Sequence, residues 1–318
     1  MVSVVVGPGS LGCLFAAFLA ADAGAEVWLL DKRPERAAYL AAQGIIIEAA
    51  GRTRRVRVRA TAQPGEIPAC DLVLLTVKAH AVAAALARLP AGLFRPQGLL
   101  VTLENGIAHL PLLATWTTAP AALGVTAQGA TLLATGQVRH AGQGPTWLGF
   151  SAAVSQDLAS RLEAVAAHLT RVGLPAQVAP DILGQVWLKL MVNAGINALT
   201  ALLDCPNGAL PERPEARALL EQAVAETVAV ARKKGVAVPE DPVAMTVAVC
   251  QATAANISSM LQDVRAGRPT EIEAINGAVA AEARRLGMAA PVNEALCRAV
   301  QAVSAGRPPE MPGLQARP

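Results

Sequence analysis

Charged residues are scarce in this sequence: Asp, Glu, Lys and Arg make up 16% of its 318 residues, whereas hydrophobic residues make up 53%. This composition provides a sizeable core and argues against intrinsic disorder. The formal net charge of +3 is small for the length, and a nucleic-acid-binding surface needs clustered Lys and Arg. We therefore expect a globular protein long enough for two domains, with no nucleic-acid partner.

Paired cysteines and histidine motifs are also missing. The five cysteines, at positions 13, 70, 205, 250 and 297, form no CxxC pair, and the four histidines fit neither HxH nor HExxH spacing. A disulfide framework needs paired cysteines, and a zinc site needs closely spaced Cys or His ligands. The sequence thus predicts no metal centre, and a reducing cytoplasm is the simpler location.

The stretch from residue 2 to residue 21 has no charged residue, a property shared with signal peptides and membrane spans. No basic segment precedes it, however, and Gly7-Pro8-Gly9 would break a spanning helix. A buried strand, a tight turn and a buried helix account for the same apolar content. We expect these three elements and no membrane partner.

The sequence GPGSLG, from Gly7 to Gly12, lies between a β-branched run at residues 2–6 and a helix-forming run at residues 11–23. A second strand follows at residues 26–30, which completes the βαβ setting of a dinucleotide-binding turn. In such turns the first glycine permits the turn, the second lets the pyrophosphate approach, and the third allows close packing. The predicted cofactor-binding residues of the turn are Gly7, Pro8, Gly9, Ser10, Leu11 and Gly12. A glycine-rich turn that binds no nucleotide is the alternative.

The end of the second strand gives two opposed signals about the cofactor. Asp31 occupies the acidic position that accepts hydrogen bonds from the ribose hydroxyls of NAD. Lys32 and Arg33 follow at once, and cations there suit the 2′-phosphate of NADP. Asp31 could turn away or pair with Arg33, and on these residues we favour NADPH.

Strands alternate with helices through the first half, which predicts an α/β Rossmann-type domain with a mostly parallel sheet at residues 1–177. Residues 137–140 and 146–148 are expected to add antiparallel strands to that sheet. Residues 178–318 are predicted to form an all-α domain, with helices at 182–203, 215–234, 242–261, 271–286 and 293–303.

The sequence has one local basic cluster, which comprises Arg52, Arg54, Arg55, Arg57 and Arg59. It predicts an edge strand with a solvated face, and the alternative is a phosphate or partner role.

Polar residues stand out at three places in this apolar background. Lys78 and Asn105 each follow an apolar strand, and open α/β sheets bind ligands beyond the carboxyl ends of their strands. Lys189, Asn193 and Asn197 are spaced i, i+4, i+8, so they drift only about 40° per step and share one helix face. The alternatives are that Lys78 is an ordinary surface lysine, that Asn105 only forms an Asn-Gly turn, and that the helix stripe is a structural hydrogen-bonded one.

The combined pattern resembles the ketopantoate reductase (2-dehydropantoate 2-reductase) family. The matching segments are Gly7–Gly12, Val77-Lys78-Ala79, Leu103-Glu104-Asn105-Gly106, Lys189 with Asn193 and Asn197, Ser258–Asp263, Thr270-Glu271-Ile272 and Ile275-Asn276-Gly277. The resemblance implies an NADPH-dependent cytoplasmic enzyme that reduces 2-dehydropantoate in pantothenate synthesis. It implies that Lys189 is the catalytic lysine and that Glu271 works beside it, whereas Glu271 alone could simply cap a helix.

The resemblance also assigns binding residues. Asn193, Asn197, Asn207 and Ser259 would bind substrate, Lys78 and Asn105 would line the nicotinamide side, with Asn105 also near the substrate, and Lys32 would meet the 2′-phosphate. Two alternatives stay open: reduction of another 2-oxo acid, with Arg265 or Arg268 binding its carboxylate, and a regulator that binds NADPH without turnover. The apolar helices of the second domain could bury a homodimer interface or only their own core.

Overall fold

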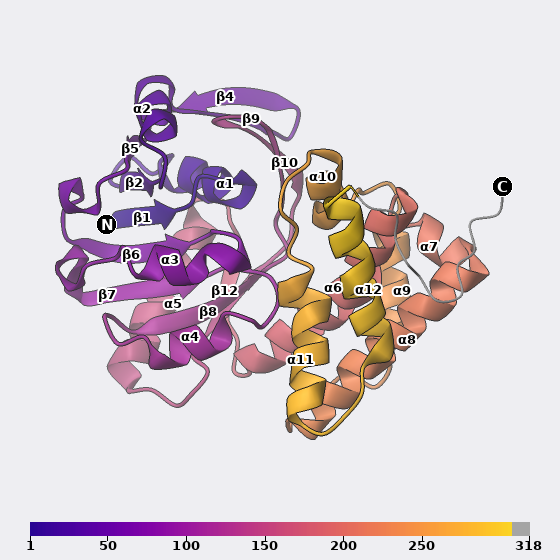
Figure 1. Ribbon diagram of the computed structural model, residues 1–318. Helices are drawn as coiled ribbons and strands as arrows, with labels where there is room; N and C mark the ends of the chain where they lie inside the picture. The colour runs from indigo at the N-terminus through magenta and orange to yellow at the C-terminus, as the bar shows by residue number, and fades with distance from the viewer. Residues whose placement is uncertain (307–318) are drawn as a thin grey trace. The chain divides into compact units, whose positions relative to one another are not determined.

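The structure, a computed structural model, describes residues 1–306 (Figure 1). Contacts within the chain define two units. The first unit comprises Met1–Glu104 and His109–Ile182, and the second comprises Asn105–Ala108 together with the chain from Leu183 onward. The four-residue segment 105–108 therefore packs with the second unit, although the chain before and after it belongs to the first.

An eight-stranded sheet forms the centre of the first unit, in the order β12-β11-β8-β7-β6-β1-β2-β5. All neighbours from β5 to β8 are parallel, and β11 runs antiparallel to β8. This arrangement confirms the mostly parallel Rossmann-type sheet. The strands are β1 (Val2–Val6), β2 (Glu26–Leu30), β5 (Arg59–Thr61), β6 (Cys70–Leu75), β7 (Phe94–Thr102), β8 (Ala121–Thr126), β11 (Thr146–Gly149) and β12 (Ala176–Val178).

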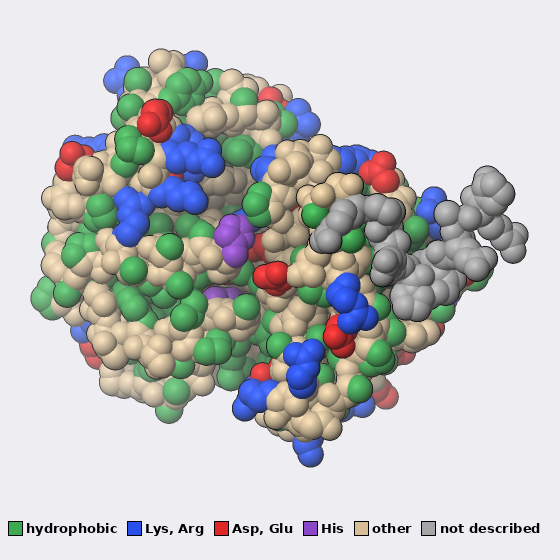
Figure 2. Space-filling view, in the orientation of Figure 1, with side chains coloured by type: hydrophobic (Ala, Val, Ile, Leu, Met, Phe, Trp, Pro, Cys, Tyr) green, Lys and Arg blue, Asp and Glu red, His purple; other side chains and the backbone are tan. Residues whose placement is uncertain are grey.

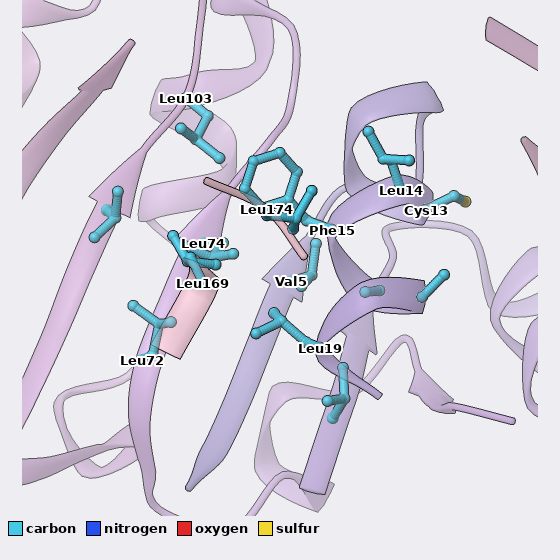
Figure 3. Close-up of a cluster of buried hydrophobic side chains, with 14 of the residues drawn as sticks. Val5, Cys13, Leu14, Phe15, Leu19, Leu72, Leu74, Leu103, Leu169 and Leu174 are labelled. Atoms are coloured by element: carbon cyan, nitrogen blue, oxygen red, sulfur yellow. The ribbon is translucent and has the colours of Figure 1, made fainter. Parts of the chain in front are cut away.

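One face of this sheet is covered by α1 (Ser10–Leu19) and α5 (Gln156–Arg171). Figure 3 shows Phe15 and Leu19 of α1, Leu72 and Leu74 of β6 and Leu169 of α5 in one buried cluster. Each such buried side chain contributes about 1.5–3 kcal/mol to folding. The other helices of the unit are α2 (Pro34–Gln43), α3 (Val82–Leu86) and α4 (Leu110–Thr115).

Residues 137–140 do not join the main sheet, so that prediction is wrong. They lie in β10 (Gln137–Gly142), part of a second sheet in the order β4-β3-β10-β9, with β3 (Ile45–Ala49), β4 (Arg52–Val56) and β9 (Gly129–Ala134). Ile45, Ile47 and Val138 of this sheet are buried in the same core as α1. The apolar face of the second sheet thus covers the outer side of α1. Arg52, Arg54 and Arg55 of β4 form an exposed edge as expected, but the basic cluster is split, since Arg57 lies outside the strands and Arg59 begins β5 of the main sheet.

Helices are the only regular elements among the described residues of the second unit, which confirms the predicted helical domain. Its helices are α6 (Ile182–Leu203, which begins at the last residue of the first unit), α7 (Ala209–Glu212), α8 (Pro214–Lys233), α9 (Pro242–Ala252), α10 (Ser259–Arg265), α11 (Ala278–Arg285) and α12 (Pro291–Ser304). The single helix expected at 242–261 is wrong: α9 ends at Ala252, and the Ser258 side chain accepts a hydrogen bond from the Leu261 N–H to start α10. A π-helical turn, Glu273–Gly277, precedes α11.

Helix α6 is the one helix of the described residues that is long and apolar enough to cross a membrane. Length and composition alone do not separate a spanning helix from a core helix. In α6, 67% of the most apolar 18-residue stretch is buried within the protein, and the helix carries Lys189 and two asparagines. These features are typical of the core helix of a folded domain.

Candidate functional site

The glycine-rich turn after β1 has the geometry that dinucleotide binding requires. Gly7 has φ +94°, in the region that favours glycine, and its N–H donates to the Leu30 carbonyl at 3.0 Å. A Cβ at Gly12 would lie 2.1 Å from the Gly7 carbonyl oxygen, whereas a Cβ at Gly9 would meet no atom within 4 Å. Gly12 therefore packs α1 against the turn, and Gly9 leaves open space at the amino end of α1. A pyrophosphate fits such a place, because the helix dipole and N–H groups there favour anions.

Asp31 does pair with a neighbouring arginine, but the partner is Arg36. Arg33 contributes only its backbone N–H, at 3.1 Å from Oδ1 of Asp31. The side chains of Lys32 and Arg33 are exposed. Figure 2 shows several Lys and Arg side chains gathered on the visible face of the first unit. Lys78 directly follows the loop after β6 and is half-buried.

Lys189 and Glu271 form the charged centre of the second unit. Lys189 lies in the first half of α6, and Glu271 lies just before the π-helical turn. Burial lowers the pKa of Lys189 to about 8, and the negative charge of Glu271 acts in the opposite direction. A lysine with this pKa is mostly protonated at neutral pH but yields its proton readily, as a general acid must.

Asn105 joins the charged pair through the segment that packs with the second unit. Its Nδ2 donates a 2.8 Å hydrogen bond to Oε2 of Glu271. The Ile107 N–H donates to the Ala274 carbonyl at 3.3 Å, and Gly106 has φ +79°. A Cβ at Gly106 would lie 1.9 Å from the Ala274 carbonyl oxygen, so only glycine allows this approach. The sequence predicted a role for Asn105 and included Gly106 only as part of the matching segment and of a possible Asn-Gly turn.

The predicted substrate-binding residues occupy two regions of the second unit. Asn193 is half-buried on α6 and Asn197 is buried one turn later. Asn207 lies beyond the end of α6, where its Nδ2 donates to the Thr253 hydroxyl at 2.9 Å. Within residues 1–306 its buried Oδ1 has no hydrogen-bond partner.

Ser259 is exposed at the first position of α10, and its neighbour Ser258 carries the structural contacts. The Thr200 hydroxyl donates to Ser258 Oγ at 2.7 Å, which ties the start of α10 to α6. Thr200 lies three residues after Asn197 and was missed by sequence reasoning, because a threonine within an apolar helix gives no functional signal.

A buried amide network supports the region around Lys189 and Glu271. Asn276 donates from Nδ2 to the Ala194 carbonyl and to Oδ1 of Asn293, both at 3.0 Å. Asn293 donates to Glu226 Oε2 at 2.8 Å, and Glu226 also accepts the backbone N–H groups of Val292 and Asn293. The network thus connects α6, the π-helical turn, α12 and α8. Asn276 was predicted only as part of a motif, and no role was predicted for Asn293.

We expect Asn276→Leu to lower the free energy of unfolding by about 2–5 kcal/mol. Leucine is close in volume but leaves two buried acceptors, the Ala194 carbonyl and Asn293 Oδ1, without this donor. Urea denaturation measures the effect. Thr246→Val is the matched control: Thr246 is fully buried and donates only within its helix, to the Pro242 carbonyl at 2.8 Å, so loss of its hydroxyl is expected to cost about 1 kcal/mol. Equal effects in the two variants would contradict a special role for Asn276.

The turn, the sheet and the lysine–glutamate pair together define a Rossmann-type dinucleotide-binding protein with a helical second unit. Residues 3–153 match the family described as ketopantoate reductase PanE/ApbA, and residues 181–304 match its C-terminal family. The 2-dehydropantoate 2-reductase of Halobacterium salinarum is 38% identical over 94% of this chain and 97% of the relative. The Vibrio cholerae enzyme of the same name is 35% identical over 94% and 96%. The chain therefore belongs to the ketopantoate reductase family of oxidoreductases, as the sequence pattern predicted.

Solved structures agree with this assignment. A PanE/ApbA family ketopantoate reductase from Ralstonia eutropha superimposes with a TM-score of 0.86 at 27% identity, covering 96% of this chain and 99% of its own. A D-mandelate dehydrogenase in complex with NADH and anilino(oxo)acetate superimposes with a TM-score of 0.87 at 25% identity, with coverage of 96% and 99%. The same architecture therefore serves more than one substrate.

Proposed function

We propose that this protein reduces 2-dehydropantoate to pantoate with NADPH, in the cytoplasm, as a step of pantothenate synthesis. The observation that carries the proposal is the arrangement of Lys189, Glu271 and Asn105 in the second unit, in a chain whose first unit holds an open glycine-rich turn. Relatives that align with almost the whole chain are named for this reaction.

The reduced nicotinamide would supply a hydride to the C2 ketone of the substrate. Negative charge then develops on the ketone oxygen, and Lys189 is proposed to stabilise that charge and to donate its proton there. Glu271 favours the protonated form of Lys189, so the acid is charged before the reaction. Asn105 fixes the Glu271 carboxylate through its 2.8 Å hydrogen bond.

Neutral polar side chains are proposed to hold the remainder of the substrate. Asn193, Asn197, Asn207 and Ser259 offer both donors and acceptors, which suit a hydroxyl and a carboxylate. The two arginines considered for the carboxylate already have acidic partners: Arg265 pairs with Asp204 at 2.7 Å and Arg268 with Asp263 at 3.0 Å. We therefore leave both arginines out of the proposed site.

Reduction of another 2-oxo acid is the second candidate, because the neighbouring D-mandelate dehydrogenase structure has nearly the same fold. Initial rates with 2-dehydropantoate, followed by the loss of reduced-nicotinamide absorbance, test the choice against pyruvate, 2-oxoisovalerate and phenylglyoxylate. We expect 2-dehydropantoate with NADPH to give the highest kcat/KM. A higher value with phenylglyoxylate or with NADH would replace the substrate or the cofactor in the proposal, and tight NADPH binding without any turnover would favour a regulator.

A further inference from the structure

Asp31 is engaged by an arginine from the helix that follows it. Its side chain is only 1% exposed, directly after β2. Nε of Arg36 donates to one carboxylate oxygen, and Nη2 of Arg36 donates to the other at 2.8 Å. The Arg33 N–H adds a third hydrogen bond, at 3.1 Å. Both oxygens of the Asp31 carboxylate are therefore occupied, and its charge is balanced within the protein.

The local sequence places Arg36 where it can make this contact. Pro34 is the first residue of α2, and its fixed φ suits the first turn of a helix. Arg36 lies in that first turn, and helical side chains lean toward the amino end, which is the side of Asp31. Arg88 holds the same corner from another direction, since its Nη1 donates to the Asp31 carbonyl at 3.2 Å.

An aspartate at this position has a direct effect on the choice of dinucleotide. A free carboxylate accepts hydrogen bonds from the ribose hydroxyls of NAD and repels the 2′-phosphate of NADP. Here Arg36 balances the charge of the carboxylate and binds both of its oxygens, and the side chain is only 1% exposed, so both effects are weakened. Lys32 and Arg33 are exposed, and in the described part of the chain neither forms a salt bridge. The remaining local charge is therefore positive.

We propose that Arg36 is a specificity-determining residue that makes the site prefer the 2′-phosphorylated dinucleotide by occupying Asp31. This inference rests on the proposed function only in that the chain binds a nicotinamide dinucleotide. It assigns Arg36 an indirect role: Arg36 acts by neutralising Asp31, and Lys32 and Arg33 supply the cations that attract the phosphate.

A double-mutant cycle on cofactor binding tests this role. Dissociation constants of NADPH and NADH are measured by nicotinamide fluorescence, without any 2-oxo acid, for the full chain and for Arg36→Met, Asp31→Asn and the double variant. Arg36→Met is expected to lower the preference for NADPH over NADH by about tenfold or more, because it exposes the Asp31 charge. Asp31→Asn is expected to keep the preference, and the double variant is expected to restore it to within about threefold of the original.

Two further variants keep the test decisive. Arg36→Gln can still donate to Asp31 but carries no charge, and it is expected to lower the preference even if Arg36→Met does not fold. Arg95→Met removes the arginine of another Asp pair of the first unit, in which Nη1 of Arg95 lies 2.9 Å from each oxygen of Asp71, and it is expected to leave the preference unchanged.

The outcomes separate this inference from the proposed function. If the double variant lost as much preference as Arg36→Met, Arg36 would bind the phosphate itself and the indirect role would be overturned. A wild-type protein that bound NADH as tightly as NADPH would also overturn it. Failure to reduce 2-dehydropantoate, with the NADPH preference and the cycle as expected, would overturn the proposed substrate and leave the role of Arg36 standing.

Discussion

Lys189→Met is expected to lower kcat by about a thousandfold while the dissociation constant of NADPH changes by less than about threefold. A positioned general acid contributes on the order of 10²–10⁴ in rate, and a group that stabilises a developing oxyanion contributes a similar factor. Lys189 is proposed to do both, whereas the glycine-rich turn and the basic residues after β2 belong to the first unit. Methionine has a length similar to that of the lysine stem and removes the charge. Steady-state rates and fluorescence titration measure the two quantities.

Lys234→Met provides the control for this loss. Lys234 also lies in the second unit and pairs with a carboxylate, that of Glu282, but its side chain is 31% exposed. An exposed ion pair contributes little to stability and nothing to the proposed chemistry, so kcat is expected to stay within about twofold. Near-normal turnover in Lys189→Met would remove Lys189 from the mechanism, and equal losses in both variants would indicate a general effect of lysine removal.

The parts of the site that follow from chain periodicity could be predicted from the sequence. The glycines at 7, 9 and 12 stand at fixed offsets after an apolar strand, and Lys189, Asn193 and Asn197 repeat with the period of a helix. Their placement on α1 and α6 depends only on local geometry. The parallel sheet and the helical second unit follow from the same periodic signals.

Contacts between distant or competing side chains could not be predicted in this way. Asn105 and Glu271 are 166 residues apart, and their hydrogen bond depends on segment 105–108 packing with the second unit. For Asp31 the sequence predicted Arg33 as a partner, whereas in the structure the side-chain partner is Arg36. Arg36 lies in the first turn of α2, where side chains lean toward the amino end of the helix and so toward Asp31. The second sheet was missed since strand order is set by long-range pairing, which has no short-range sequence signal.

Glu271→Gln is expected to lower kcat/KM by about a hundredfold at pH 8. The fall of kcat/KM with rising pH is expected to begin at a lower pH in this variant than in the wild type. Glutamine keeps an oxygen that can accept the Asn105 hydrogen bond, so the variant mainly removes the negative charge. That charge raises the pKa of Lys189 against the effect of burial, and in the wild type the balance is about 8. Without Glu271, the pKa of Lys189 therefore falls.

The direction of the pH effect follows from the role of Lys189 as an acid. Only protonated Lys189 can donate, so kcat/KM is highest below its pKa and falls as the pH rises through it. The wild-type decline is expected near pH 8, and that of Glu271→Gln at lower pH. Glu273→Gln is the matched control, because Glu273 is an exposed carboxylate two residues away that accepts from Gln301 at 2.7 Å. Its profile is expected to match the wild type. A Glu271→Gln profile that declined at the wild-type pH would show that the Glu271 charge does not act on the acid, and the role of Glu271 would then be limited to its hydrogen bond with Asn105.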